Sequence, residues 1–143
     1  MQIILLAMLR QPVAQRLIVE MGADPDVRAI YEPDYAQIPG DAVAFRANAA
    51  LIEIAESGEC DAGYCLSLCA RLRRESPACR LMLLCPEQDE PSVSAVVEAA
   101  RDRRIDDFFF YDSSIDFIAT KLLTSYSANN RGIREENRLY HNQ

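Results

Sequence analysis

An acidic residue interrupts one of the most apolar stretches of the chain. The segment NAALIEIAESGE, residues 48–59, carries Glu53 in its middle and breaks at Gly58. An ionised carboxylate is costly to bury unless a partner neutralises it or donates hydrogen bonds to it. We therefore expect Glu53 at the rim of a crevice, with Tyr111 donating a hydrogen bond to it or Arg10 pairing with its charge. The alternative is that Glu53 is a solvated acid at the edge of a loop.

Cysteines are the other residues that could do chemistry. There are five of them, an odd number without CxxC spacing: Cys60, Cys65, Cys69, Cys79 and Cys85. A redox or zinc site needs exposed thiolates of low pKa, or tetrahedral ligand spacing with a histidine nearby. The only histidine is His141, close to the C-terminus. We expect the cysteines to be small buried hydrophobes, as free cysteine often is in cores, and thiol redox chemistry is the alternative.

Two further motifs have simple interpretations. RLRR, residues 71–74, could be a basic patch, but such a run is more often the solvated face of a helix. DFFFY, residues 107–111, could be a stacking platform, but in a central strand aromatic side chains pack on helices on both faces of the sheet. We expect Phe109 and Phe110 in the core. No glycine-rich phosphate loop, paired-acid site or Ser/His/Asp set can be assembled, so we expect no enzyme, no metal and no cofactor.

Composition and charge exclude several classes of protein. A chain of 143 residues, 50% hydrophobic and 26% charged, is typical of one globular domain. Its formal net charge of -7 argues against binding to nucleic acid, whose phosphates need basic partners. The first apolar run is too short to span a bilayer and lacks the features of a signal peptide. We therefore expect a cytoplasmic protein without a membrane partner.

Short apolar runs alternate with segments of helical periodicity along the chain. The expected strands cover residues 2–8, 27–31, 49–54, 79–85 and 105–111. The expected helices cover residues 12–21, 41–46, 62–75, 92–102 and 113–126. The second helix is expected to be short because Pro39 and Gly40 precede it. Such alternation is the pattern of a parallel α/β sheet.

Five strand–helix units in a chain of this length predict a flavodoxin-like, doubly wound α/β fold. Its five-stranded parallel sheet has the order 2-1-3-4-5, helices cover both faces, and the functional crevice lies at the carboxyl ends of the strands. Apolar periodicity is lost beyond Tyr126. We therefore expect one domain over residues 1–126 and a C-terminal tail over residues 127–143.

Three segments of the chain resemble the receiver domain of two-component response regulators. They are ALIEIAE, YCLSLCARLRRESPACRLMLLC and RIDDFFFYD. The corresponding receiver pattern is a strand ending in a phospho-accepting aspartate, a helix ending in a leucine-arginine pair, a strand ending in Thr or Ser, and a strand ending Asp-Tyr-x-x-Lys-Pro. The resemblance covers about residues 2–126. The order and spacing of the segments are similar to those of the receiver pattern.

The reactive positions of that family have all changed in this chain. By the resemblance, Glu53 stands where receivers have the phospho-accepting aspartate. The place of the two acids that hold magnesium is LAMLR, residues 6–10, which contains no acid. Cys85 takes the place of the Thr or Ser, Phe108 that of the switch aromatic, and Tyr111 that of the lysine.

The resemblance implies a pseudo-receiver in a two-component-type regulatory system, which contacts a protein partner or forms a homodimer without phosphorylation. Phosphoryl transfer depends on charge neutralisation, and the groups that supply it are missing. Receivers commonly use the face of the fourth helix, fifth strand and fifth helix, about residues 92–126 here. Its charged residues are Arg103, Arg104, Asp106, Asp107 and Lys121. The alternative is a small-ligand or thiol-redox sensor with Cys85, Tyr111 and Glu53 lining the crevice.

Overall fold

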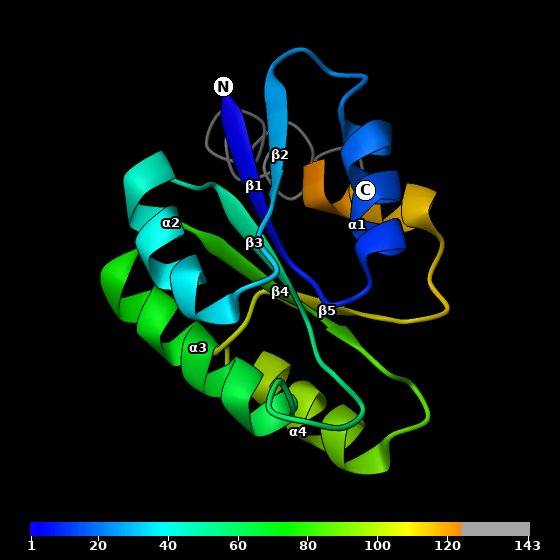
Figure 1. Ribbon diagram of the computed structural model, residues 1–143. Helices are drawn as coiled ribbons and strands as arrows, with labels where there is room; N and C mark the ends of the chain where they lie inside the picture. Colours follow the sequence, from blue (N-terminus) through cyan, green and yellow to red (C-terminus); the bar gives the residue numbers. More distant parts are fainter. Residues whose placement is uncertain (124–143) are drawn as a thin grey trace, which may run out of the picture.

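The fold is built on a five-stranded parallel sheet with the strand order β2-β1-β3-β4-β5 (Figure 1). The computed structural model describes residues 1–123. The strands are β1 (Gln2–Ala7), β2 (Val27–Tyr31), β3 (Ala49–Glu53), β4 (Arg80–Cys85) and β5 (Asp107–Phe110). The predicted fold class and strand order are confirmed. This flavodoxin-like arrangement places the loops that follow β1, β3, β4 and β5 along one edge of the sheet.

Helices cover both faces of the sheet. They are α1 (Gln11–Met21), the short 3-10 helix η1 (Tyr35–Gln37), α2 (Ile38–Phe45), α3 (Ala62–Glu75) and α4 (Glu90–Arg101). The chain is helical again over residues 115–123. α2, α3 and α4 pack on one face, while α1 and residues 115–123 pack on the other (Figure 1). The bounds of α3 agree with the predicted residues 62–75.

Side chains of β3 alternate between the two cores. Ala50 and Ile52 are buried beneath α2, α3 and α4, whereas Ala49 and Leu51 are buried beneath α1 and residues 115–123. Successive side chains of a strand point to opposite faces, so a strand covered on both sides is apolar throughout. Glu53 is the position in β3 at which this pattern ends.

The prediction for the second helix is wrong at its start. We expected it to begin near residue 41, but α2 begins at Ile38 and includes Pro39 and Gly40. Proline is tolerated in the first turn of a helix because the N–H group that it lacks has no partner there. For the same reason α4 begins at Glu90, two residues before its predicted start, with Pro91 in its first turn.

The aromatic run of β5 packs on both faces of the sheet, as predicted. Phe109 is 4% exposed and belongs to the core beneath α1. Phe108 and Phe110 pack against the opposite core, with ring centroids 5.6 Å apart in an edge-on arrangement. β5 itself is shorter than the predicted residues 105–111 because its ladder with β4 pairs only Asp107 to Phe110.

Two further predictions concern the chain as a whole. Within residues 1–123, no helix has the length and hydrophobicity needed to cross a membrane. The predicted domain boundary at residue 126 and the predicted tail, residues 127–143, lie outside the described residues.

Candidate functional site

Glu53 is buried and fully engaged at the carboxyl end of β3. Its exposure is 1%, so the alternative that it is a solvated loop-edge acid is wrong. One carboxylate oxygen, Oε1, accepts hydrogen bonds from the backbone N–H groups of Leu9, at 2.8 Å, and Arg10, at 3.1 Å. The other oxygen, Oε2, accepts a short hydrogen bond from Nε of the Arg10 side chain. The carboxylate is thus neutralised by a charge and satisfied by the donors around it.

The topology of the sheet explains why Arg10 is the partner. β1 and β3 are parallel neighbours, and Ala7 pairs in register with Ile52. The connection from β1 to α1 therefore leaves the sheet next to the end of β3. Arg10 is the N-cap residue of α1 and has an extended conformation, with φ of -89°. This places both its N–H group and its side chain beside the Glu53 carboxylate.

Tyr111 contacts the arginine that pairs with Glu53. The Arg10 guanidinium lies over the Tyr111 ring, 3.9 Å from its centroid, which is a favourable cation–π geometry. The Tyr111 hydroxyl donates to the carbonyl of Ile54, so the proposed hydrogen bond from Tyr111 to Glu53 is not the one that forms. Burial and the nearby negative charge of Glu53 raise the pKa of Tyr111, which therefore stays protonated and can donate.

A second tyrosine, which the sequence analysis missed, also contacts this strand end. The hydroxyl of Tyr35, in η1, donates to the backbone carbonyl of Glu53 at 2.6 Å. Tyr35 is 3% exposed, and burial raises its pKa above the ordinary tyrosine value. The Asp34 carboxylate caps η1 by accepting from Ala36 N, at 3.1 Å, and so orients this turn. The capping pattern of DYAQ was the one local signal that could have indicated a fixed turn here.

The two carbonyls at the end of β3 are therefore each held by a tyrosine from a different element. Tyr35 reaches Glu53 O from the β2 side, and Tyr111 reaches Ile54 O from the β5 side. Cys65 Sγ, at the start of α3, adds a weaker contact to Glu53 O at 3.7 Å. This arrangement fixes the backbone on both sides of the Glu53 side chain.

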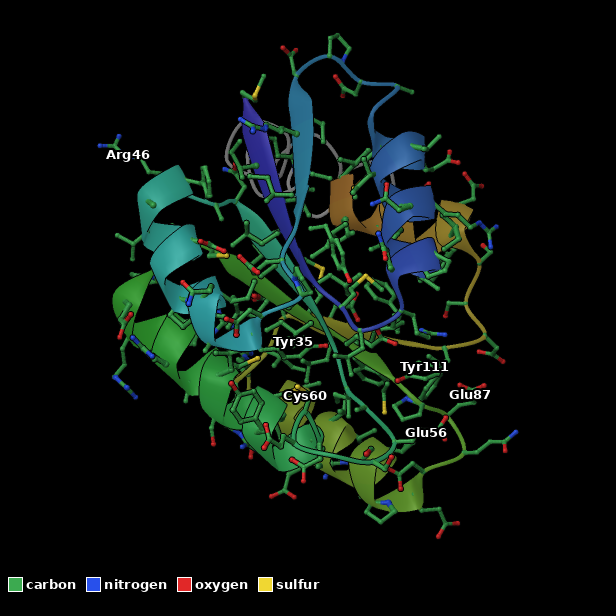
Figure 2. The ribbon with its side chains drawn as sticks, in the orientation of Figure 1. Tyr35, Arg46, Glu56, Cys60, Glu87 and Tyr111 are labelled. Carbon is green, nitrogen blue, oxygen red and sulfur yellow. The ribbon has the colours of Figure 1, made fainter. Side chains whose placement is uncertain are left out.

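Beside Tyr111 the sheet edge is hollowed and acidic. An open cavity of about 510 Å³ is lined by Glu56, Glu87, Gln88, Asp89 and Tyr111. Figure 2 shows Tyr111, Glu56 and Glu87 close together at this end of the sheet. Glu87 Oε2 also accepts from the Tyr111 backbone N–H at 3.1 Å. Within residues 1–123, no three His, Cys, Asp or Glu residues are placed to hold a metal ion.

Cys85 lies at this edge, whereas Phe108 is the second residue of β5 and pairs with Leu83. Cys85, the last residue of β4, is buried, and its Sγ contacts the carbonyl of Pro86 at 3.7 Å. Burial, and to a lesser degree Asp89 and Glu87, raise the pKa of Cys85 to about 11. The thiol is therefore protonated at neutral pH. Phe108 is half-buried against Phe110.

Two of the five charged residues expected at an interface make contacts within the chain. Asp106 is already used within the chain, because its Oδ2 lies 3.1 Å from Arg73 Nη2 and accepts from Leu81 N at 2.8 Å. Asp107 accepts from the N–H of Phe108 at 2.8 Å. The remaining three interface candidates are exposed: Arg103, Arg104 and Lys121.

Comparison with known proteins rests on structure. No protein-family model matches the chain, and no curated protein matches its sequence. Solved structures match it well. A LuxR-family DNA-binding response regulator from Staphylococcus aureus aligns with a TM-score of 0.69 and 10% identity, over 88% of this chain and 99% of that one. The signal receiver domain of a modulated diguanylate cyclase from Desulfovibrio desulfuricans aligns with a TM-score of 0.68 and 13% identity, over 90% and 95%.

The chain has the receiver fold. A third structure, from a family described as streptococcal redox sensors that evolved from two-component response regulators, aligns with a TM-score of 0.74 and 15% identity, over 91% of this chain and 53% of that one. The neighbours of this receiver-like chain thus include response regulators and a redox sensor. Identities this low establish the fold alone.

Proposed function

We propose that this receiver-like chain is a pseudo-receiver, a signalling module that works through protein contacts and has no phosphorylation cycle or catalytic activity of its own. The observation that carries this proposal is the pairing of Glu53 with Arg10. Arg10, in the β1–α1 connection, pairs with Glu53 at the end of β3. By the resemblance, this is the place where receivers hold a magnesium ion between acids. We place the module in the cytoplasm, where two-component-type regulation operates.

The geometry around Glu53 is unfavourable for phosphoryl transfer. Both of its carboxylate oxygens accept hydrogen bonds, and its 1% exposure leaves no open approach for a phosphoryl donor. The reaction also requires cations that neutralise the charge developing on the transferred group. Losing one such stabilising donor commonly costs about a hundredfold or more in rate. At the position of the family's lysine, Tyr111 donates to a backbone carbonyl instead.

A direct test is to offer the protein a phosphoryl donor. We expect no stable adduct on Glu53 after incubation with acetyl phosphate and magnesium, and no magnesium-dependent binding of beryllofluoride. Intact-mass analysis under mild conditions and two-dimensional NMR spectra measure the two outcomes. An active receiver domain treated in parallel is the control. An acyl phosphate on Glu53, or spectral shifts that require magnesium, would contradict the proposal.

The partner surface that we favour lies on α4 and the chain that follows it. A hollow of about 470 Å³ on α4 is lined by Val93, Ser94, Val97, Glu98, Arg101 and Asp102. Two exposed cations, Arg103 and Arg104, follow Asp102 directly in the chain. A surface that combines valines, acids and arginines can pair with its own copy across a two-fold axis or with a protein of similar mixed charge.

Charge reversal tests this surface. We expect the double substitution Arg103→Glu and Arg104→Glu to weaken self-association, or binding to a purified partner, by about tenfold or more, because like charges then face each other. Sedimentation velocity over a range of concentrations measures the dissociation constant. Arg74→Glu, at an exposed position of α3, is the matched control and should leave association unchanged. Equal effects of the two changes would place the interface elsewhere.

The redox-sensor alternative receives less support at the crevice itself. The likeness to a streptococcal redox sensor is a reason to consider it. However, Cys85 has no exposed surface, and its Sγ contacts the carbonyl of Pro86, so an oxidant in solution has no direct access to this thiol. We therefore do not assign redox chemistry to Cys85.

A further inference from the structure

A different pair of cysteines lies at the start of α3. Asp61 is the N-cap of this helix and accepts from Tyr64 N at 2.9 Å. Cys60 therefore occupies the position before the N-cap, and Cys65 is the fourth residue of the helix. These two positions are the ones whose side chains meet in the hydrophobic staple that begins many helices.

The two cysteines are in contact and differ in accessibility. Cys65 Sγ contacts the carbonyl oxygen of Cys60 at 3.6 Å. Cys60 is half-buried, whereas Cys65 has no exposed surface. Figure 2 shows Cys60 on the connection between β3 and α3. The Cys60 carbonyl also accepts from Ala55 N at 2.7 Å, so the loop of residues 55–60 is closed on itself next to the pair.

We propose that Cys60 and Cys65 form a disulfide by exchange with a small cationic disulfide, a modification that goes beyond the signalling role proposed above. The thiolate of Cys60 attacks the small disulfide, forms a mixed disulfide and releases one small thiolate. The thiolate of Cys65 then attacks Cys60 Sγ, forms the protein disulfide and releases the second. Two electrons and two protons pass from the two cysteines to the two released thiols.

The other cysteines are poorly placed to compete. Cys65 and Cys69 lie four residues apart in α3, where Cβ atoms are about 5 to 6 Å apart, whereas a disulfide needs about 3.8 Å. Cys65 is buried too, and burial raises its pKa, but Cys65 has to react only with the mixed disulfide on the neighbouring Cys60. Cys69 and Cys79 are buried in the core. Neither offers a small disulfide a route of attack.

Charges around Cys60 determine which disulfide reacts. Glu59 and Asp61 flank Cys60 and raise its pKa, after the larger contribution of burial. These acids repel anionic disulfides such as glutathione disulfide and attract a cationic one such as cystamine. At low ionic strength we expect cystamine to react about tenfold faster than glutathione disulfide, and salt to reduce this ratio.

Formation of the disulfide changes a hydrogen bond at the end of β3. Cys65 Sγ contacts the Glu53 carbonyl at 3.7 Å, and oxidation removes the proton that it donates. The Tyr35 hydroxyl remains on that carbonyl. The new bond also closes a short loop across the start of α3. In the chain-entropy account, a closed loop of this size raises Tm by roughly 5 °C.

Peptide mapping tests the proposal. The protein is incubated with cystamine, quenched in acid, denatured and alkylated, and the tryptic peptide of residues 47–71 is analysed by mass spectrometry. We expect this peptide to lose two hydrogens, with Cys60 and Cys65 protected and Cys69 alkylated, and Tm to rise. Cys60→Ser should show neither change with cystamine, whereas Cys69→Ala should still form the bond. A persistent cystamine adduct on Cys60, a bond from Cys65 to Cys69, or full alkylation of all three would overturn the proposal.

Discussion

Replacing Arg10 by alanine is expected to lower the free energy of unfolding by about 2 to 4 kcal/mol. Removing one partner of a buried ion pair commonly costs about 3 to 5 kcal/mol, because the remaining charge stays buried without neutralisation. The effect is reduced here because the Arg10 side chain is 39% exposed, so water can reach part of the vacated space. The substitution also removes the cation–π contact with Tyr111. Urea denaturation followed by circular dichroism measures the change.

A matched control is available on α3. Arg71 donates through Nε to Glu75 at 2.9 Å, but both side chains are substantially exposed, at 52% and 39%. Exposed pairs at this spacing contribute about 0.3 to 0.5 kcal/mol, so Arg71→Ala should be nearly neutral. The double variant Arg10→Ala with Glu53→Gln should recover part of the loss, since no buried charge remains. If Arg10→Ala costs no more than Arg71→Ala, the buried pair does not stabilise the fold.

The second large effect is expected at Tyr35. Tyr35→Phe removes the hydroxyl that donates to the Glu53 carbonyl and leaves that buried acceptor with only the weak Cys65 contact. An unsatisfied buried acceptor costs about 1 to 3 kcal/mol. We expect a loss of this size in urea denaturation. We also expect the neighbouring amides to exchange their hydrogens faster.

Tyr64→Phe is the control for this change. Tyr64 contacts the ring of Tyr35, with centroids 6.4 Å apart, but it is 38% exposed. Its hydroxyl can bond to water, so the substitution should change stability by less than about 0.5 kcal/mol. Similar losses for Tyr35→Phe and Tyr64→Phe would show that the hydrogen bond from Tyr35 to Glu53 contributes no more to stability than a hydroxyl exposed to water.

The fold was largely predictable from the sequence because its signals are periodic and local. The apolar runs of β3 and β4 need helices on both faces, and only a parallel sheet with alternating helices provides them. α3 was predicted with its observed bounds since its apolar positions recur at helical spacing, and the structure shows that Asp61 caps its start. The start of α2 was missed because Pro39 was interpreted as a helix breaker, whereas it stands in the first turn.

In the candidate site, the sequence predicts only those contacts that the strand order itself sets. Arg10 follows β1, and the strand order alone places it beside Glu53. Tyr35 reaches the same strand from a turn 18 residues away in sequence, and no periodic pattern marks that turn. Asp106 was assigned to an outer surface since nothing local predicts that Arg73, on α3, would pair with it. Contacts of this kind depend on the three-dimensional path of loops.

The pairing of Glu53 with Arg10 also constrains how the chain can evolve. A change at Arg10 alone leaves an unmatched anion in the interior, and shortening Glu53 to aspartate alone withdraws its oxygens from the Leu9 and Arg10 N–H groups. Each single change is therefore less stable than the present pair, although the combined change need not be. Stepwise replacement of both residues would have to pass through a less stable intermediate, which favours retention of the present pair.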